Sequence, residues 1–130
     1  MSVTFLPGIG WQLTENLELL INEGRVIIPK GFRTDLASVP CVLRWLPGFD
    51  DHSFGIPAPT LHDWSYQRDG WVTPHVRLTR KRTDELFRTL SITAGVRPWR
   101  AQIAFLAVRW FGGWAWRRMP SRPQAMWLAR

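Results

Sequence analysis

The sequence predicts an α+β fold in which an N-terminal β-hairpin or small antiparallel sheet packs on about three C-terminal helices. Short apolar runs around a glycine-containing turn dominate the first 40 residues, whereas apolar residues after residue 57 recur at helical spacing. A length of 130 residues with 45% apolar content suits one hydrophobic core. We therefore expect a single domain over residues 1–130, with a β-rich part (1–40), a helical part (57–118) and a C-terminal tail (119–130).

The hairpin is predicted over residues 17–28. Two aliphatic runs, Leu17 to Ile21 and Arg25 to Ile28, flank a short turn that ends in Gly24. This length and composition are typical of a β-hairpin. A second turn at Lys30-Gly31 leads to residues 32–35, which we expect as a short third strand or an extended loop.

Two shorter segments are expected next. Ser38 is suited to cap a short helix over residues 39–45, because Pro40 then falls in its first turn. Residues 47–59 are rich in Gly, Pro and Asp, which predicts a loop.

A longer helix is predicted over residues 58–68. Thr60 is its expected cap, and Gly70 is expected to end it. Residues 71–77 are interpreted as a loop or a short strand.

Two further helices complete the prediction. Thr79 is suited to cap a helix that runs to about residue 93 and is closed by Gly95. Pro98 then starts a helix to about residue 117. This last helix is apolar on most sides, so we expect it to be largely buried or to lie against another surface.

Charge is distributed unevenly along the chain. The net charge is +7, all ten acidic residues lie at or before Glu85, and the last 45 residues contain eight arginines and no acid. Such asymmetry indicates an anionic partner, either a phospholipid surface or an acidic protein. Nucleic acid is less favoured because no DNA- or RNA-binding motif is recognisable. Alternatively, the arginines only solubilise an aromatic surface by laying their stems across it.

No segment predicts export or membrane insertion. The first ten residues lack the basic and apolar regions of a signal peptide, so secretion by that route is not expected. The longest apolar run, Ile103 to Trp116, is shorter than the roughly 20 residues of a membrane span. The single cysteine, Cys41, cannot form an internal disulfide.

Polar residues able to carry chemistry gather in three places. They supply the candidate site residues, which are Thr34, Asp35 and Ser38, then His62, Asp63 and Tyr66, and finally Asp84. Adjacent helical side chains diverge by roughly 100°, so His62 and Asp63 need different roles, whereas Tyr66 shares the face of His62. If Asp84 faces His62, its carboxylate holds one imidazole nitrogen while the other acts as a general base on water. Asp63 would then bind a divalent cation with oxygens around Asp35.

Each of these residues also has a structural interpretation. Asp35 and Ser38 can cap nearby backbone. His62 and Asp84 can form a buried structural pair, and Asp63 can pair with an arginine. A catalytic triad built on Ser38 is less favoured because Ser38 lacks the Gly-x-Ser-x-Gly turn. The partner of Asp84, either His62 or an arginine, distinguishes an active site from a purely structural polar cluster that joins the β-rich part to the helices.

The run His62-Asp63-Trp64-Ser65-Tyr66 resembles the His-Asp-x-x-Tyr helix of the phospholipase A2 superfamily. The resemblance implies that the histidine activates water and that the neighbouring aspartate binds calcium. It also implies a second antiparallel helix whose aspartate orients the histidine, a role that Asp84 would fill. The chain departs from that superfamily because it lacks the disulfides and the glycine-rich calcium loop.

Most of the chain resembles a phage and prophage family catalogued as domain of unknown function 1353. Four ordered elements carry this resemblance: Pro29 to Pro40, His62 to Tyr66, Thr83 to Phe87, and Ala107 to Gly112. The family implies a phage context, with the host cytoplasm or the virion as the location and a phage or host protein as a partner. It implies no settled activity.

Two functions follow as hypotheses. The first is a small phage-encoded hydrolase with His62, Asp84 and Tyr66 as catalytic residues. The alternative is a non-enzymatic virion or tail component, or a host-factor-binding protein, in which the same cluster is structural.

Overall fold

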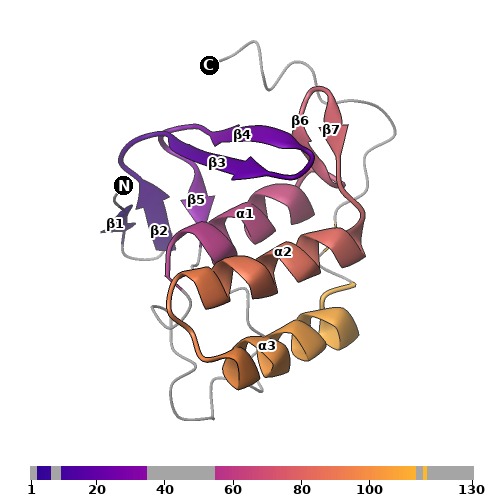
Figure 1. The fold of residues 1–130 in the computed structure, drawn as a ribbon. Coiled ribbons are helices and arrows are strands. Elements are labelled where there is room, and N and C mark those ends of the chain that lie inside the picture. Colours follow the sequence, from indigo (N-terminus) through magenta and orange to yellow (C-terminus); the bar gives the residue numbers. More distant parts are fainter. Residues whose placement is uncertain (1–2, 7–9, 35–54, 114–115, 117–130) are drawn as a thin grey trace.

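The computed structural model describes residues 3–6, 10–34, 55–113 and 116, and these residues form an α+β fold (Figure 1). The strands are β1 (Val3–Leu6), β2 (Gly10–Leu13), β3 (Leu17–Ile21), β4 (Gly24–Ile28), β5 (Arg33–Thr34), β6 (Trp71–Thr73) and β7 (Val76–Arg77). The helices are α1 (Pro57–Tyr66), α2 (Arg80–Thr93) and α3 (Pro98–Phe111). The predicted fold class is confirmed.

The predicted hairpin is formed by β3 and β4. The two strands are antiparallel, with Leu17 opposite Ile28. Side chains alternate between the two faces, so that Val26 and Ile28 are buried while Leu20 is 86% exposed. The buried face packs on α1, where it joins Leu61 in one hydrophobic core.

The remaining strands are short. β1, β2 and β5 form a three-stranded antiparallel sheet, so residues 32–35 do contain the short third strand. The sequence did not single out β1 and β2, because four residues are too few for alternation to be recognised. β6 and β7 pair as a small hairpin over the segment predicted as a loop or a short strand.

Several predicted segments lie outside the described residues. These are the short helix over residues 39–45, most of the loop over residues 47–59, and the tail over residues 119–130.

α1 begins three residues before its predicted cap. Pro57 occupies the first turn, where its fixed φ angle and missing N–H are well tolerated, and Thr60 is buried inside the helix. The helix ends at Tyr66 instead of residue 68. Gly70, which was expected to end the helix, lies three residues beyond the C-cap Gln67, with φ +87° and its N–H donating to the Ser65 carbonyl at 2.9 Å.

α2 has the predicted start and end, because the Thr79 hydroxyl accepts from the Arg82 amide at 3.0 Å and Gly95 follows with φ +105°. α3 starts at Pro98 as predicted but stops at Phe111 instead of residue 117. The Gly112-Gly113 pair explains the early stop, since glycine destabilises a helix by about 1 kcal/mol relative to alanine. Within the described residues, no helix is both long and apolar enough to cross a bilayer.

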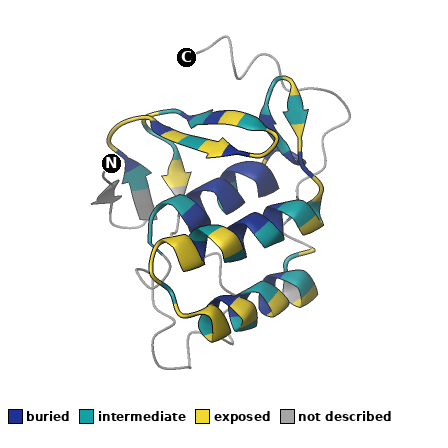
Figure 2. Cartoon of the chain, viewed as in Figure 1, coloured by how far each residue is buried: buried dark blue, intermediate teal, exposed yellow. Residues whose placement is uncertain are grey.

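The helices lie side by side beneath the β3–β4 hairpin, with α1 between the hairpin and α2 and with α3 on the far side of α2 (Figure 1). Eight of the ten residues of α1 are buried, which makes it the most enclosed element (Figure 2). α3 packs on α2 through small residues, with Ala104 and Ala107 against Phe87. The central place of α1 forces its polar residues His62 and Ser65 into the interior.

Candidate active site

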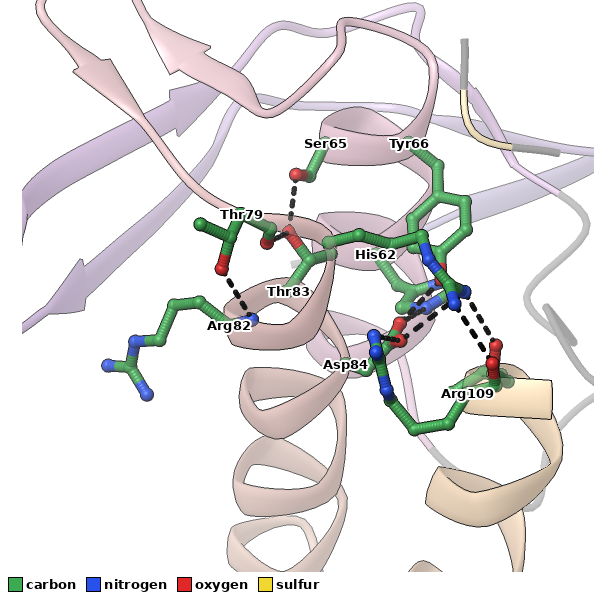
Figure 3. Close-up of polar contacts among 10 residues, drawn as sticks. His62, Ser65, Tyr66, Thr79, Arg82, Thr83, Asp84 and Arg109 are labelled. Carbon is green, nitrogen blue, oxygen red and sulfur yellow. Dashed lines mark hydrogen bonds and ion pairs between the residues drawn. The ribbon is translucent and has the colours of Figure 1, made fainter. Parts of the chain in front are cut away.

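A polar cluster lies where the three helices meet (Figure 3). α1 contributes His62 and Tyr66, which are one turn apart, and α2 contributes Arg80 and Asp84, which are also one turn apart. α3 contributes Arg109. The helical periodicity of each segment therefore delivers these side chains to one point.

Asp84 is the centre of the cluster and is fully buried. Its Oδ1 accepts hydrogen bonds from His62 Nε2 at 2.8 Å and from the Tyr66 hydroxyl at 2.6 Å. Its Oδ2 accepts from Arg109 at 2.9 Å, and Arg80 Nη1 lies 3.8 Å from the same oxygen. Asp84 thus binds both the histidine and arginines.

The protonation state of Asp84 follows from these contacts. Burial by itself raises the pKa of the carboxyl, but the hydrogen bond from His62, the charge of that ring when it is protonated, and the hydrogen bonds from Tyr66 and Arg109 outweigh burial and hold the pKa below its ordinary value. Asp84 is therefore an anion at neutral pH.

His62 is held in one orientation. Its ring stacks on Tyr66 with centroids 4.1 Å apart and meets the edge of Phe87 at 5.2 Å. Because ionised Asp84 can only accept, Nε2 carries a hydrogen, and in the neutral imidazole the lone pair lies on Nδ1. Nδ1 is buried and has no hydrogen-bond partner among the described residues.

Tyr66 acts as a fixed donor. Burial and the charge of Asp84 raise the pKa of its hydroxyl above the usual value, so the group stays protonated. The hydroxyl oxygen also accepts from Arg80 Nη1 at 3.2 Å. Tyr66 therefore positions the Asp84 carboxylate and is not suited to exchange protons near neutral pH.

Arg80 ties α2 to the end of α3. It donates to the carbonyl oxygens of Val108 at 3.0 Å and Arg109 at 2.9 Å, which are among the last acceptors of α3. Gly112 allows this approach, because a Cβ atom there would lie 2.8 Å from the Tyr66 hydroxyl and 3.2 Å from Arg80 Nη1.

A second set of hydroxyls sets the register between α1 and α2. Ser65 Oγ and Thr83 Oγ1 are 2.7 Å apart and buried, and Thr83 Oγ1 donates to the Thr79 carbonyl at 3.0 Å. Since the Thr83 hydrogen is used in that bond, Ser65 is the donor to Thr83. This contact holds the two helices so that His62 faces Asp84.

The Gly31-Phe32 pair, which belongs to the family element Pro29 to Pro40, contacts α1 through the aromatic ring of Phe32. Phe32 meets Trp64 edge-on with centroids 5.1 Å apart, and Arg68 lies 3.4 Å above the Trp64 ring. Arg68 is 9% exposed, and burial lowers the pKa of its guanidinium to about 10. The end of the β-rich part is thereby attached to the helix that carries His62.

The other predicted site residues are placed differently. Thr34 lies in β5, with its backbone opposite Trp11, while Asp35 and Ser38 lie outside the described residues. Asp63 is half-buried next to His62. No three His, Cys, Asp or Glu side chains within the described ranges gather as metal ligands.

Sequence reasoning did not place Arg80 and Arg109 in the site. Arg80 could have been found from its position four residues before Asp84, where an ion pair is expected. Arg109 lies in the late Ala-Val-Arg-x-Phe-Gly element, but its partner depends on how α3 crosses α2, which spacing does not reveal.

A pocket of about 310 Å³ lies beside the cluster and is lined by Asp69, Arg77, Leu78, Thr79, Arg80 and Trp116. Asp69 is buried and accepts from Arg77 and from the Trp116 indole, both at 2.6 Å. Trp116 also meets Tyr66 edge-on at 5.0 Å. The pocket thus lies next to Tyr66 and Arg80, and two of its charged lining groups, Asp69 and Arg77, already bind each other.

The family profile described as "Protein of unknown function (DUF1353)" matches residues 11–108. The chain belongs to the DUF1353 family. No curated protein and no solved structure matches it. In this DUF1353 protein the matched range contains His62, Tyr66, Arg80 and Asp84, whereas Arg109 directly follows its end.

Proposed function

We propose that this DUF1353 protein is a small phage-encoded hydrolase in which His62 Nδ1 acts as a general base on water. The observation that carries the proposal is the difference between the two ring nitrogens. Nε2 is held by Asp84 at 2.8 Å, whereas buried Nδ1 has no partner among the described residues. A buried polar atom without a partner costs about 1–3 kcal/mol, so Nδ1 favours a water or a substrate group as its partner.

The proposed reaction is the hydrolysis of an ester. Nδ1 takes a proton from water as the water oxygen attacks the carbonyl carbon, and the Asp84 anion stabilises the imidazolium that forms. The ester C–O bond then breaks, and the alkoxide that leaves takes the proton from Nδ1. The products are a carboxylic acid and an alcohol, with His62 restored.

The supporting residues have separate tasks in this scheme. Tyr66 and Arg109 hold the Asp84 carboxylate, and Asp84 in turn orients the ring. A divalent cation such as calcium would be held by Asp63, with Asp35, outside the described residues, as a further proposed ligand, and it would supply electrophilic assistance to the carbonyl oxygen. This division of tasks is similar to the one that the phospholipase A2 resemblance implies.

The substitution His62→Gln tests the proposal, because glutamine keeps an N–H donor for Asp84 and lacks a base. With p-nitrophenyl esters and calcium, we expect turnover to fall by roughly 10²–10⁴-fold. The matched control is His75→Gln, since His75 is exposed between β6 and β7. Unchanged turnover in His62→Gln, or an equal loss in both variants, would remove the catalytic assignment.

A second candidate function rests on the burial of Asp84. The carboxylate is fully enclosed and receives hydrogen bonds from α1 and α3 while belonging to α2. In this alternative the cluster is purely structural and holds the helices together, and the protein is a virion or tail component or a host-factor-binding protein. It predicts no ester hydrolysis by the wild-type protein at any calcium concentration.

A further inference from the structure

α3 has a second apolar face that the described elements leave largely exposed. Trp99, Ile103, Leu106 and Trp110 follow one another at spacings of four, three and four residues, so they form one stripe along the helix. Trp99 is 55% exposed, Leu106 39% and Trp110 73%. Figure 2 shows that the side of α3 turned away from α2 carries many of the exposed residues.

The exposed residues of this stripe are separate from the face that holds α3 in the fold. Among the α3 residues whose burial is described, Ala101, Ala104, Ala107 and Val108 are buried, and they lie on the other side of the helix. Small side chains suffice there because α3 approaches α2 closely around Phe87. Ile103, at the edge of the stripe, also packs against this core, whereas the exposed side chains of Trp99, Leu106 and Trp110 do not belong to it.

Positive charge borders the stripe. Arg97 is exposed just before α3, and Arg100 lies 5.4 Å from the Trp99 ring centroid. Arg88 of α2 lies 4.1 Å from the Phe105 centroid and binds Gln102 at 2.8 Å. The chain has no acidic residue after Glu85, so α3 itself carries no charge of opposite sign.

We propose that α3 docks lengthwise on the surface of an anionic phospholipid bilayer. Indole rings settle at the headgroup level, aliphatic side chains enter the upper acyl region, and arginines bind lipid phosphates. Trp99 and Trp110 stand about 16 Å apart along the axis, with Ile103 and Leu106 between them. The stripe therefore has indole rings at both ends, aliphatic side chains between them and arginines at its border, which matches the groups that a bilayer interface binds.

Two other binding partners fit the apolar stripe of α3 less well than a bilayer does. A second copy of α3 would bring the bordering arginines of both copies together, and like charges repel. Nucleic acid would satisfy the arginines but would offer no apolar phase to Ile103 and Leu106. This proposal does not depend on catalysis by His62.

Vesicle flotation tests the proposal with the full chain. We expect binding to vesicles made of equal parts phosphatidylcholine and phosphatidylglycerol, and weak binding to phosphatidylcholine alone. The double variant Trp99→Ala/Trp110→Ala should bind anionic vesicles at least roughly tenfold more weakly. Leu106→Ser, a second variant of the same stripe, should weaken binding in the same direction.

Matched controls distinguish binding through this surface from nonspecific binding to vesicles. Leu20→Ala removes an apolar side chain that is 86% exposed on β3, and it should leave binding unchanged. Arg97→Gln should weaken binding roughly fivefold, whereas Arg25→Gln, on β4 and paired with Glu18, should not. Circular dichroism should show the same fold in every variant.

Three results would overturn the proposal. The first is equal binding of anionic vesicles by wild type and both stripe variants, or no binding by wild type. The second is a dimer in sedimentation velocity that the double tryptophan variant dissociates. The third is complete displacement of the vesicles by a short DNA duplex.

Discussion

Arg109 of α3 donates to the Asp84 carboxylate at 2.9 Å across 25 residues of sequence, and the same carboxylate holds His62 of α1 at 2.8 Å. Asp84 thus takes both of the partners that the sequence presented as alternatives. One buried anion joins the candidate base to the packing of α3, so the chemistry proposed for His62 and the stability of the helical part share one group.

Removing the Arg109 charge is expected to destabilise the fold. Arg109→Met keeps most of the stem but leaves Asp84 Oδ2 with weaker support from Arg80. We expect a loss of about 2 kcal/mol in the free energy of unfolding, since hydrogen bonds to charged groups contribute about 1.5–3 kcal/mol. Urea titration of the wild type and of Arg109→Met measures this change in the free energy of unfolding. Arg97→Met is the control, and an equal loss in that exposed variant would contradict the assigned role.

Acid is expected to weaken the protein through Asp84. The pKa of Asp84 is lowered in the folded state, so its contribution to stability is complete above the unfolded pKa of about 3.9 and is lost as the pH falls through the lower folded pKa. Urea unfolding between neutral pH and pH 2 should show this loss below about pH 4. In Asp84→Asn the acid dependence should be shallower, and an unchanged slope would argue against Asp84 as its source.

Gly112 is expected to tolerate no side chain. A Cβ atom there would lie 2.5 Å from the Val108 carbonyl oxygen and 2.8 Å from the Tyr66 hydroxyl. Gly112→Ala should therefore cost about 1–3 kcal/mol and disturb the contact between Tyr66 and Arg80. Among the described residues, no atom lies within 4 Å of the place that a Cβ of Gly113 would take, so Gly113→Ala should be close to neutral. Thermal melts of the two variants should differ; identical melting temperatures would contradict the packing.

Gly70 is expected to be the more sensitive of two glycines with positive φ. Gly70 has φ +87°, and a Cβ there would collide with the Leu78 carbonyl oxygen, whereas Gly95 has φ +105° and no described residue within 4 Å of the place of its Cβ. Both substitutions to alanine strain the backbone by about 1–2 kcal/mol, but only Gly70→Ala adds a collision with backbone. Chemical unfolding should show the larger loss for Gly70→Ala. A similar loss in both variants would show that the chain relieves the collision.

Much of the fold could be predicted because its determinants are local. The β3–β4 hairpin follows from two aliphatic runs around a turn with Gly24, and α2 follows from the Thr79 cap and the closing Gly95. Element ends were less accurate where local signals compete. Threonine is a residue type that favours helix N-caps, but Pro57 starts α1 before Thr60, and Thr60 is buried inside the helix.

The sequence by itself determined the fold class, the family and three of the polar residues of the cluster, which are His62, Tyr66 and Asp84, because apolar periodicity and motif order are properties of neighbouring residues. Only the tertiary structure decided that Asp84 binds His62, Tyr66 and Arg109 together, and that Nε2 is the ring nitrogen it holds. It also decided that α3 buries its alanines and exposes its tryptophans. These outcomes depend on how three helices cross, and that geometry is set by packing between residues far apart in the chain.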